Sequence, residues 1–449
     1  MNTPIFDFVK HYADTDISRF HMPGHKGHAF LGCEAYDITE INGADVLYAA
    51  DGVIAESEEN ASGLFGTAHS FYSTEGSSLC IKAMLALATA NTKKATRSLI
   101  LAARNVHKAF VYACALLDLR VAWLEPTERE HLCACPVTAE RVAQTLETME
   151  ELPAAVYLTS PDYLGNLADI AGIAKVCKAK RIPLLVDNAH GAYLQFLTPS
   201  RHPIALGATM CCDSAHKTLP VLTGGAYLHL SPDAEVDVTA ARNMLSVFAS
   251  TSPSYLILQS LDLCNRYLAE GYTERLRSCI ERLDRVKQAL AERGFFVEQT
   301  EPLKLVLHAS EFGYMGLELA EHLREYSIEA EFADDAYLVL MATPETRDTD
   351  YARLTAAFAS LTPKAMSAPI VSMSLSAADR EVCLSMREAI FSPRELVPIE
   401  KAVGRICASP TVSCPPAVPV VISGERITAA AVEIMLRCYG IDEVEVVKE

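Results

Sequence analysis

The sequence predicts an α/β protein in which a mostly parallel central sheet carries helices on both faces and a smaller α+β domain follows. Between about residues 74 and 230, short apolar runs typical of buried strands alternate with segments of helical length. Strands that alternate with helices require right-handed crossovers, which place helices on both faces of the sheet. Because 449 residues exceed what one hydrophobic core usually supports, we expect an N-terminal arm (1–60), a large domain (61–300) and a small C-terminal domain (301–449).

The individual elements are predicted from the length and periodicity of each apolar run. Strands of the large domain are expected at 98–104, 119–124, 154–160, 182–190, 208–214 and 224–230. Helices are expected at 77–90, from 107 onward, and at 138–149, 170–180 and 254–293, whereas the first sixty residues show little periodicity and are expected to be irregular. The small domain is expected to run strand 303–308, helix 316–326, strand 336–341, helix 351–361, and then a proline-rich tail from 392.

The composition is that of a globular protein. Its 39 Lys and Arg against 57 Asp and Glu give a net charge of −18, which opposes binding to nucleic acid or to an anionic membrane surface. No run of about 18 apolar residues predicts a membrane span, and the opening MNTPIFDFVK lacks the features of a secretory signal. We therefore expect a cytosolic protein whose 14 cysteines are reduced.

No metal site is predicted. His131, Cys133 and Cys135 lie close together in the sequence, but no second cluster at ligand spacing completes a tetrahedral site. Chance clustering is the simpler interpretation.

The segment DSAHKTLPVLTGG places Lys217 just past a predicted buried strand, between Ser214 and His216 on one side and a turn with two glycines on the other. Ligands of such sheets bind at the carboxyl ends of the strands. A desolvated amine there has a lowered pKa, which favours attack on a carbonyl. The alternative is a solvated lysine in a polar loop.

Asp187 ends the apolar strand of LLVDNAHGAY, where a carboxylate is unfavourable unless it faces a cation or several donors. The protonated ring nitrogen of a ligand would serve. One crossover separates Asp187 from Lys217, so both side chains can reach the same edge of the sheet. Asp187 could instead cap the next helix, and His190 is as compatible with a structural role as with a site.

Gly76, Ser77 and Ser78 come directly before a predicted helix, in YSTEGSS. A glycine lets the backbone approach a ligand, and hydroxyl and amide donors at a helix N-terminus form a natural phosphate cradle. An ordinary helix cap is the alternative, and the spacing of a nucleotide-binding loop is missing. His107, in RNVHKAF, opens another helix after a strand end, where it could lie flat over an aromatic ring or merely cap the helix.

Several of these segments together resemble one family. FHMPGHKG, the turn at Gly76, RNVHK, TSPDYLG, DNAHGAY, DSAHKTLP and STSPSY look like the Orn/Lys/Arg decarboxylases, most of all the short biosynthetic form without the N-terminal wing domain. The similarity extends from about residue 18 to the tail CPPAVPVVISGERIT. It implies a fold type I, transferase-like architecture and pyridoxal 5'-phosphate (PLP) as cofactor, bound by the large domain.

The resemblance also implies roles for the candidate residues. Lys217 would hold the cofactor as a Schiff base, Asp187 would partner its ring nitrogen, and His107 would stack on the ring. His216 or Lys217 would return a proton to the α-carbon. The remaining residues expected to bind or border the cofactor are Gly76, Ser77, Ser78, His190, Ser214 and His216.

The implied reaction is decarboxylation of arginine, lysine or ornithine to an amine used in polyamine biosynthesis. Two subunits share each site in this fold, so we expect a homodimer or a larger homo-oligomer in which residues 250–252 reach the neighbouring cofactor. Asp45 and Glu75 are candidates to receive the distal cation of the substrate.

Three positions depart from the family pattern. Glu75 occupies a place where asparagine is more usual, Asn188 stands where glutamate often follows the aspartate, and Ala417 replaces a common glycine. None of them removes a cofactor anchor, but they leave the choice of amino acid open.

Other functions remain compatible with parts of the sequence. Amino transfer or β-elimination could occur on the same scaffold, and a catalytically silent homologue could act as a regulator, although it would have no reason to keep Lys217 and Asp187. A metal hydrolase would need ligands whose spacings match no standard set, namely His21, His25, His28, His107 and His190.

Overall fold

The computed structural model describes residues 1–90, 98–126, 131–364, 375, 377–412 and 415–449. Its chain divides into two compact units, each built from separate segments. The first comprises Met1–Lys93, Ala154–Leu158 and Ile170–Arg275; the second comprises Lys94–Pro153, Thr159–Asp169 and Leu276–Glu449. The domain boundaries expected at residues 60 and 300 stay a prediction.

The first unit contains most of the predicted strand and helix series. Its elements are α1 (Pro4–Ala13), η1 (Glu34–Tyr36), η2 (Leu47–Ala49), α2 (Val53–Phe65), β1 (His69–Ser73), α3 (Gly76–Thr89), β4 (Ala155–Thr159), α6 (Ile170–Lys180), β5 (Leu184–Asp187), η3 (Ala192–Phe196), β6 (Met210–Asp213), α7 (Ala215–Thr218), β7 (Ala226–Leu230), α8 (Val238–Phe248) and α9 (Tyr255–Ala269).

The strands of this unit lie in the order β1-β7-β6-β5-β4. β5 and β6 are parallel, whereas β7 runs antiparallel to both β6 and β1. All four residues of β5 and of β6 are buried, as expected for central strands. Helix α3 packs against β6 and β7, and α6 packs against β5. The carboxyl ends of β5 and β6 therefore meet at one edge, where α7 begins.

Two features of the first unit differ from the sequence-based expectation. Helix α1 was not predicted, although it begins with Pro4 and buries Ile5, Val9 and Tyr12 on one face. The helical region expected over 254–293 is present, and it is divided into two helices, α9 and α10 (Tyr272–Glu292). Gly271 separates them with a φ of 76°, a left-handed conformation that favours glycine.

The second unit contains three sets of paired strands. Its elements are β2 (Leu99–Ala103), α4 (Lys108–Leu117), β3 (Arg120–Leu124), α5 (Ala139–Thr148), most of α10, β8 (Phe296–Val297), β9 (Lys304–His308), η4 (Ala309–Phe312), α11 (Gly316–Glu325), β10 (Phe332–Ala333), β11 (Tyr337–Met341), α12 (Asp348–Ala359), η5 (Ala377–Asp379), α13 (Met386–Phe391), β12 (Arg394–Pro398), η6 (Ile399–Lys401), α14 (Ala429–Tyr439) and β13 (Glu443–Val447).

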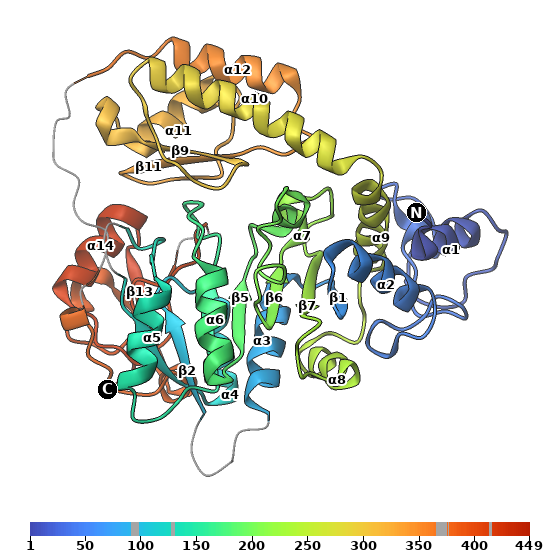
Figure 1. Ribbon diagram of the computed structural model, residues 1–449, viewed down its shortest axis with the longest axis horizontal. Helices are drawn as coiled ribbons and strands as arrows, with labels where there is room; N and C mark the ends of the chain where they lie inside the picture. The colour runs from blue at the N-terminus through green and yellow to red at the C-terminus, as the bar shows by residue number, and fades with distance from the viewer. Residues whose placement is uncertain (91–97, 127–130, 365–374, 376, 413–414) are drawn as a thin grey trace. The chain divides into compact units, whose positions relative to one another are not determined.

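β2 and β3 pair in parallel, β10-β11-β9-β8 form an antiparallel sheet, and β12 pairs with β13. Helices α10, α11 and α12 lie on one side of the sheet that contains β9 and β11 (Figure 1). This arrangement confirms the strand, helix, strand, helix order predicted for the α+β part. The proline-rich tail contains α13, β12, α14 and β13, and its residues 413 and 414 lie outside the described part of the chain. Among the described residues, no helix combines the length and apolar character needed to cross a membrane.

A buried ion pair joins two sequence motifs within the second unit. Arg104, from RNVHK, lies 3.0 Å from Glu425, from the tail, and both side chains are almost fully buried. Arg104 also donates to the carbonyl oxygens of Pro419 and Val420, and Glu425 accepts the Ile422 N–H. The pair therefore fixes the tail against the end of β2.

Replacing one member of this pair should destabilise the protein strongly. Arg104→Met leaves an uncompensated buried carboxylate, and we expect the free energy of unfolding to fall by about 3–5 kcal/mol in urea titrations. The double variant Arg104→Met/Glu425→Leu should recover most of that loss, because neither charge remains. A single variant as stable as the wild type would contradict this account.

Asp262 of α9 is a buried carboxylate that holds the N-terminal helix. It accepts the Phe6 N–H at 2.9 Å and the Ser57 hydroxyl at 2.5 Å. Burial raises the pKa of Asp262 to about 6, although the hydrogen bonds from Phe6 and Ser57 act to lower it. The folded state therefore binds this proton more tightly than the unfolded chain does.

This raised pKa gives Asp262→Asn a pH-dependent effect. The unfolded carboxyl ionises near pH 4, whereas the folded carboxyl resists ionisation up to about pH 6. The wild type therefore loses stability as the pH rises from about 4 to 6. The stability of Asp262→Asn relative to wild type should therefore increase by about 2 kcal/mol between pH 4 and pH 7. Urea unfolding at both pH values tests this, and a difference that does not change with pH would refute it.

Candidate active site

Lys217 lies on α7, directly after β6, and its amine meets a histidine from the end of β5. The Lys217 Nζ is 3.0 Å from His190 Nε2. His190 is buried within the turn that follows Asp187, and Lys217 is half-buried. The two parallel strands thus deliver an amine and an imidazole to the same edge of the sheet.

Asp187 ends β5 and is buried in surroundings that offer it little compensation. Its carboxylate accepts the Ala189 N–H at 3.2 Å and the Tyr157 hydroxyl at 3.4 Å, and the Cys212 thiol lies 3.7 Å away. Burial raises the pKa of Asp187, and the positive charge of Lys217 is the largest influence that opposes this rise. A cationic group placed against Asp187 would therefore be bound favourably.

The N-terminus of α3 has the form of an anion cradle. Gly76 opens this 14-residue helix with a φ of 70°, and a Cβ built on it would meet no atom within 4 Å. Space is therefore open in front of the first turn, where backbone N–H groups lack helical partners. Ser77 follows, and the Ser214 hydroxyl donates to its Oγ at 2.9 Å. Gly76, Ser77 and Ser214 are thus together, with Ser78 next in the same turn.

His216 is held by the glycine turn that follows Lys217. Its Nδ1 lies 3.0 Å from the Gly225 carbonyl oxygen, to which it donates. Burial lowers the pKa of His216, and the charge of Lys217 lowers it further against the effect of the Gly225 bond. The imidazole is consequently neutral at pH 7, with its proton on Nδ1.

His107 lies in the second unit, where its ring caps α4. The Ala109 N–H donates to His107 Nδ1 at 3.1 Å, which is the capping geometry that the sequence left open. Stacking of this ring on a cofactor stays a prediction.

The two carboxylates considered for the distal substrate cation have different surroundings. Asp45 accepts backbone N–H groups of five residues, Val46, Asp51, Gly52, Ile54 and Ala55, which fix the start of α2. That geometry favours a structural role for Asp45. Glu75 is exposed and accepts the Ser250 N–H at 2.6 Å within the same chain.

Sequence reasoning missed Tyr157. It also missed the contacts of Asn188 and the backbone conformation of Ala417, two positions that depart from the family pattern. Tyr157 lies in β4, and a hydroxyl within an otherwise apolar strand was the available signal. Asn188 donates to Asp213 at 2.7 Å, so a carboxylate is already present beside it. Ala417 has a φ of 57°, which explains why a glycine is common at this position.

Comparison with known proteins places this chain in a family. A family model described as Orn/Lys/Arg decarboxylase, major domain, matches residues 3–306. The chain belongs to the Orn/Lys/Arg decarboxylase family. A second model, described as the C-terminal domain of the same family, matches residues 366–438. The resemblance predicted from the motifs is therefore confirmed for both parts of the chain.

Relatives of known sequence extend over nearly the whole chain. The uncharacterized protein YaaO of Bacillus subtilis (strain 168) is 30% identical and covers 97% of this chain and 94% of its own length. An arginine decarboxylase of the same organism is 28% identical, with coverages of 95% and 91%. The constitutive lysine decarboxylase of Escherichia coli (strain K12) is 26% identical over 61% of this chain and 40% of its own length.

Solved structures of the family have the same fold. The E. coli constitutive lysine decarboxylase superposes with a TM-score of 0.80 at 18% identity, covering 100% of this chain and 82% of that chain. The Francisella novicida lysine decarboxylase LdcF gives a TM-score of 0.81 at 17% identity, covering 99% and 81%. The predicted fold type I architecture, with its smaller C-terminal domain, is confirmed.

Family and fold make the chain a decarboxylase with pyridoxal 5'-phosphate as its cofactor. The residues of the first unit fit this group. The open N-terminus of α3 suits a phosphate, and the buried Asp187 suits a protonated ring nitrogen. Lys217, which influences the pKa of Asp187, is the amine at the same sheet edge.

Proposed function

We propose that this chain decarboxylates a basic L-amino acid, with pyridoxal 5'-phosphate attached covalently to the Lys217 Nζ. The observation that carries the proposal is the grouping of the Lys217 amine with His190 and the buried Asp187 at one edge of the sheet. The charge of Lys217 acts on a buried carboxylate that a cation would stabilise, and Ser214, directly before the helix that carries Lys217, bonds Ser77 at the open N-terminus of α3.

Different residues of the first unit would hold different parts of the cofactor. When bound, the cofactor supplies an electron-accepting ring that stabilises the charge left on the α-carbon as carbon dioxide departs. Asp187 keeps a proton on the ring nitrogen. Ser77, Ser78 and Ser214 bind the phosphate with hydroxyl and backbone donors, and Gly76 leaves the space for it.

The proton that replaces carbon dioxide on the α-carbon is best supplied by Lys217. His216 carries its proton on Nδ1, which is bound to Gly225, and its lowered pKa keeps Nε2 bare at neutral pH. Once the substrate has displaced Lys217 from the cofactor, the lysine ammonium group would have protons to donate to the α-carbon. His216 then borders the cofactor and orients the turn.

Arginine is the substrate that the comparisons favour. The relatives named arginine decarboxylase cover 94–95% of this chain, whereas the match to a lysine decarboxylase covers 61%. Glu75, exposed beside the cradle, is the better of the two candidate carboxylates for the distal cation. The product would be an amine of the kind that feeds polyamine synthesis.

A homodimer is the assembly we propose. The segment around HMPGHK exposes four large apolar side chains: Phe20, Met22, Phe30 and Leu31 are between 65% and 96% accessible. Apolar side chains gathered on one segment in this way mark a contact surface. A second copy of the chain would cover them and could bring residues 250–252 to the neighbouring site.

Lys217→Ala should abolish both cofactor attachment and activity. The absorbance band of the bound cofactor near the visible edge should disappear, and amine formation should fall by at least about a thousandfold, because the covalent anchor and the proton donor are both lost. Lys178→Ala is the matched control, since Lys178 is an exposed lysine of the same unit that pairs with Asp233. A Lys217→Ala protein that keeps the band would contradict the assignment.

The cofactor-loaded enzyme should convert arginine to an amine and carbon dioxide. With arginine, lysine and ornithine offered separately, we expect kcat/KM to be greatest for arginine by about tenfold, the difference that one good charge-assisted contact supplies. Chromatography of the amines with a carbon dioxide assay measures this. A keto acid in place of the amine would instead indicate amino transfer.

A further inference from the structure

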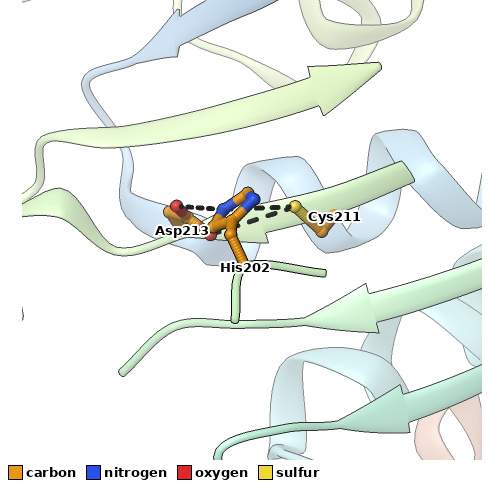
Figure 2. A group of neighbouring side chains, drawn as sticks. All are labelled: His202, Cys211 and Asp213. Carbon is orange, nitrogen blue, oxygen red and sulfur yellow. Dashed lines mark hydrogen bonds and ion pairs between the residues drawn. The ribbon is translucent and has the colours of Figure 1, made fainter. Parts of the chain in front are cut away.

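A fully buried polar cluster lies behind the candidate site in the first unit. Asp213, the last residue of β6, is surrounded by His202 and His229, and all three side chains are 0% exposed. His202 Nε2 is 3.0 Å from Asp213 Oδ2, and His229 Nε2 is 3.3 Å from the same oxygen. Figure 2 shows the His202 ring between Asp213 and Cys211, with the Cys211 thiol directed toward both of the other side chains.

The cluster is better explained by hydrogen bonds than by a metal ion. His202, Cys211 and Asp213 do offer ligand atoms within 4.8 Å of one another. However, the pKa of the Cys211 thiol is raised well above its ordinary value by burial, and Asp213 raises it further. A neutral thiol is a poor metal ligand, and the 3.0 Å contact between Asp213 and His202 is an ordinary hydrogen bond.

Asp213 carries the negative charge of the cluster. Burial acts to raise its pKa, but the two histidines outweigh this and hold the pKa well below its usual range. Burial lowers the pKa of His229, whose Nδ1 bonds the Ser70 hydroxyl at 2.8 Å. Cys80 of α3 is a further titratable group near Asp213, and burial raises its pKa to about 12. The ionised carboxylate is therefore the strongest acceptor in this part of the core.

The second carboxylate oxygen of Asp213, Oδ1, accepts a hydrogen bond from the turn that follows Asp187. The Asn188 side-chain amide donates to Asp213 Oδ1 at 2.7 Å, and Asn188 directly follows Asp187. The Asn188 carbonyl accepts the Gly191 N–H, which closes the turn that contains His190. A Cβ on Gly191 would come within 2.0 Å of Asn188 Oδ1, so the turn is wrapped tightly around this amide.

We propose that Asp213 is a positioning residue. Its buried carboxylate accepts a hydrogen bond from the Asn188 amide and thereby fixes the orientation of Asp187 and of the turn that carries His190. The same residue is followed by Ser214, which bonds Ser77 at the phosphate cradle. One carboxylate thus stabilises the positions of both the ring-nitrogen partner and the phosphate donors. This inference rests on the function proposed above.

The test uses two variants that break the same contact from opposite sides, Asp213→Asn and Asn188→Ala. The matched control is Asp262→Asn, which neutralises another buried aspartate of the first unit that has no contact with Asn188. The readouts are the dissociation constant of pyridoxal 5'-phosphate, the pH midpoint of its absorbance band and the melting temperature of each apoprotein.

Both contact variants should weaken cofactor binding by about tenfold, the usual effect of losing a partner that orients a binding group. The pH midpoint of the absorbance band should fall in both, because a displaced Asp187 holds the ring-nitrogen proton less firmly. Asp262→Asn should keep the wild-type dissociation constant and midpoint. Asn188→Ala removes only a small neutral side chain, so it remains informative if Asp213→Asn does not fold.

Three results would overturn the inference. Contact variants with the wild-type dissociation constant and midpoint would show that the cluster is only structural, and so would a parallel loss in Asp262→Asn. One equivalent of metal per chain in purified protein would identify Asp213 as a ligand. A wild type that binds no cofactor would instead defeat the proposed function, which keeps the two failures distinguishable.

Discussion

A carboxylate buried at the end of a central strand is unfavourable unless a cation or several donors compensate it, and the site depends on this constraint at Asp187. Asp187 accepts hydrogen bonds from one backbone N–H, one tyrosine hydroxyl and one thiol, and the charge of Lys217 is the main influence opposing the rise of its pKa. In the function proposed above, the protonated ring nitrogen of the cofactor would compensate this carboxylate. Pairing with that cation would then contribute favourably to the free energy of cofactor binding.

The same reasoning accounts for the residues around Asp187. Lys217 can reach the edge because β5 and β6 are parallel neighbours. Asn188, which departs from the family pattern, complements Asp213 across these strands, whereas a glutamate there would face another carboxylate at hydrogen-bonding distance. The asparagine that follows Asp187 is thus matched to a carboxylate on the neighbouring strand. The histidines His202 and His229 make that carboxylate tolerable in the core.

The sequence was informative wherever a short-range rule applies. Apolar runs located the central strands, and the rule that ligands bind at their carboxyl ends was enough to group Lys217 with Asp187. The His202, Asp213 and His229 cluster could not be predicted, because it depends on the register that sets Cys211 opposite His229 between β6 and β7. The backbone donors of Asp45 likewise come from a local fold that its sequence does not reveal. Single residues were predictable from local pattern, whereas networks that span strands were not.

Reduction of the cofactor-loaded protein with borohydride, followed by peptide mass mapping, tests the central claim most directly. Reduction makes the bond between the cofactor and its lysine permanent, so the modified peptide reveals the attachment site. The account predicts the added mass on the peptide that contains Lys217 and on no other. A cofactor mass on a different lysine, or none after loading, would contradict it.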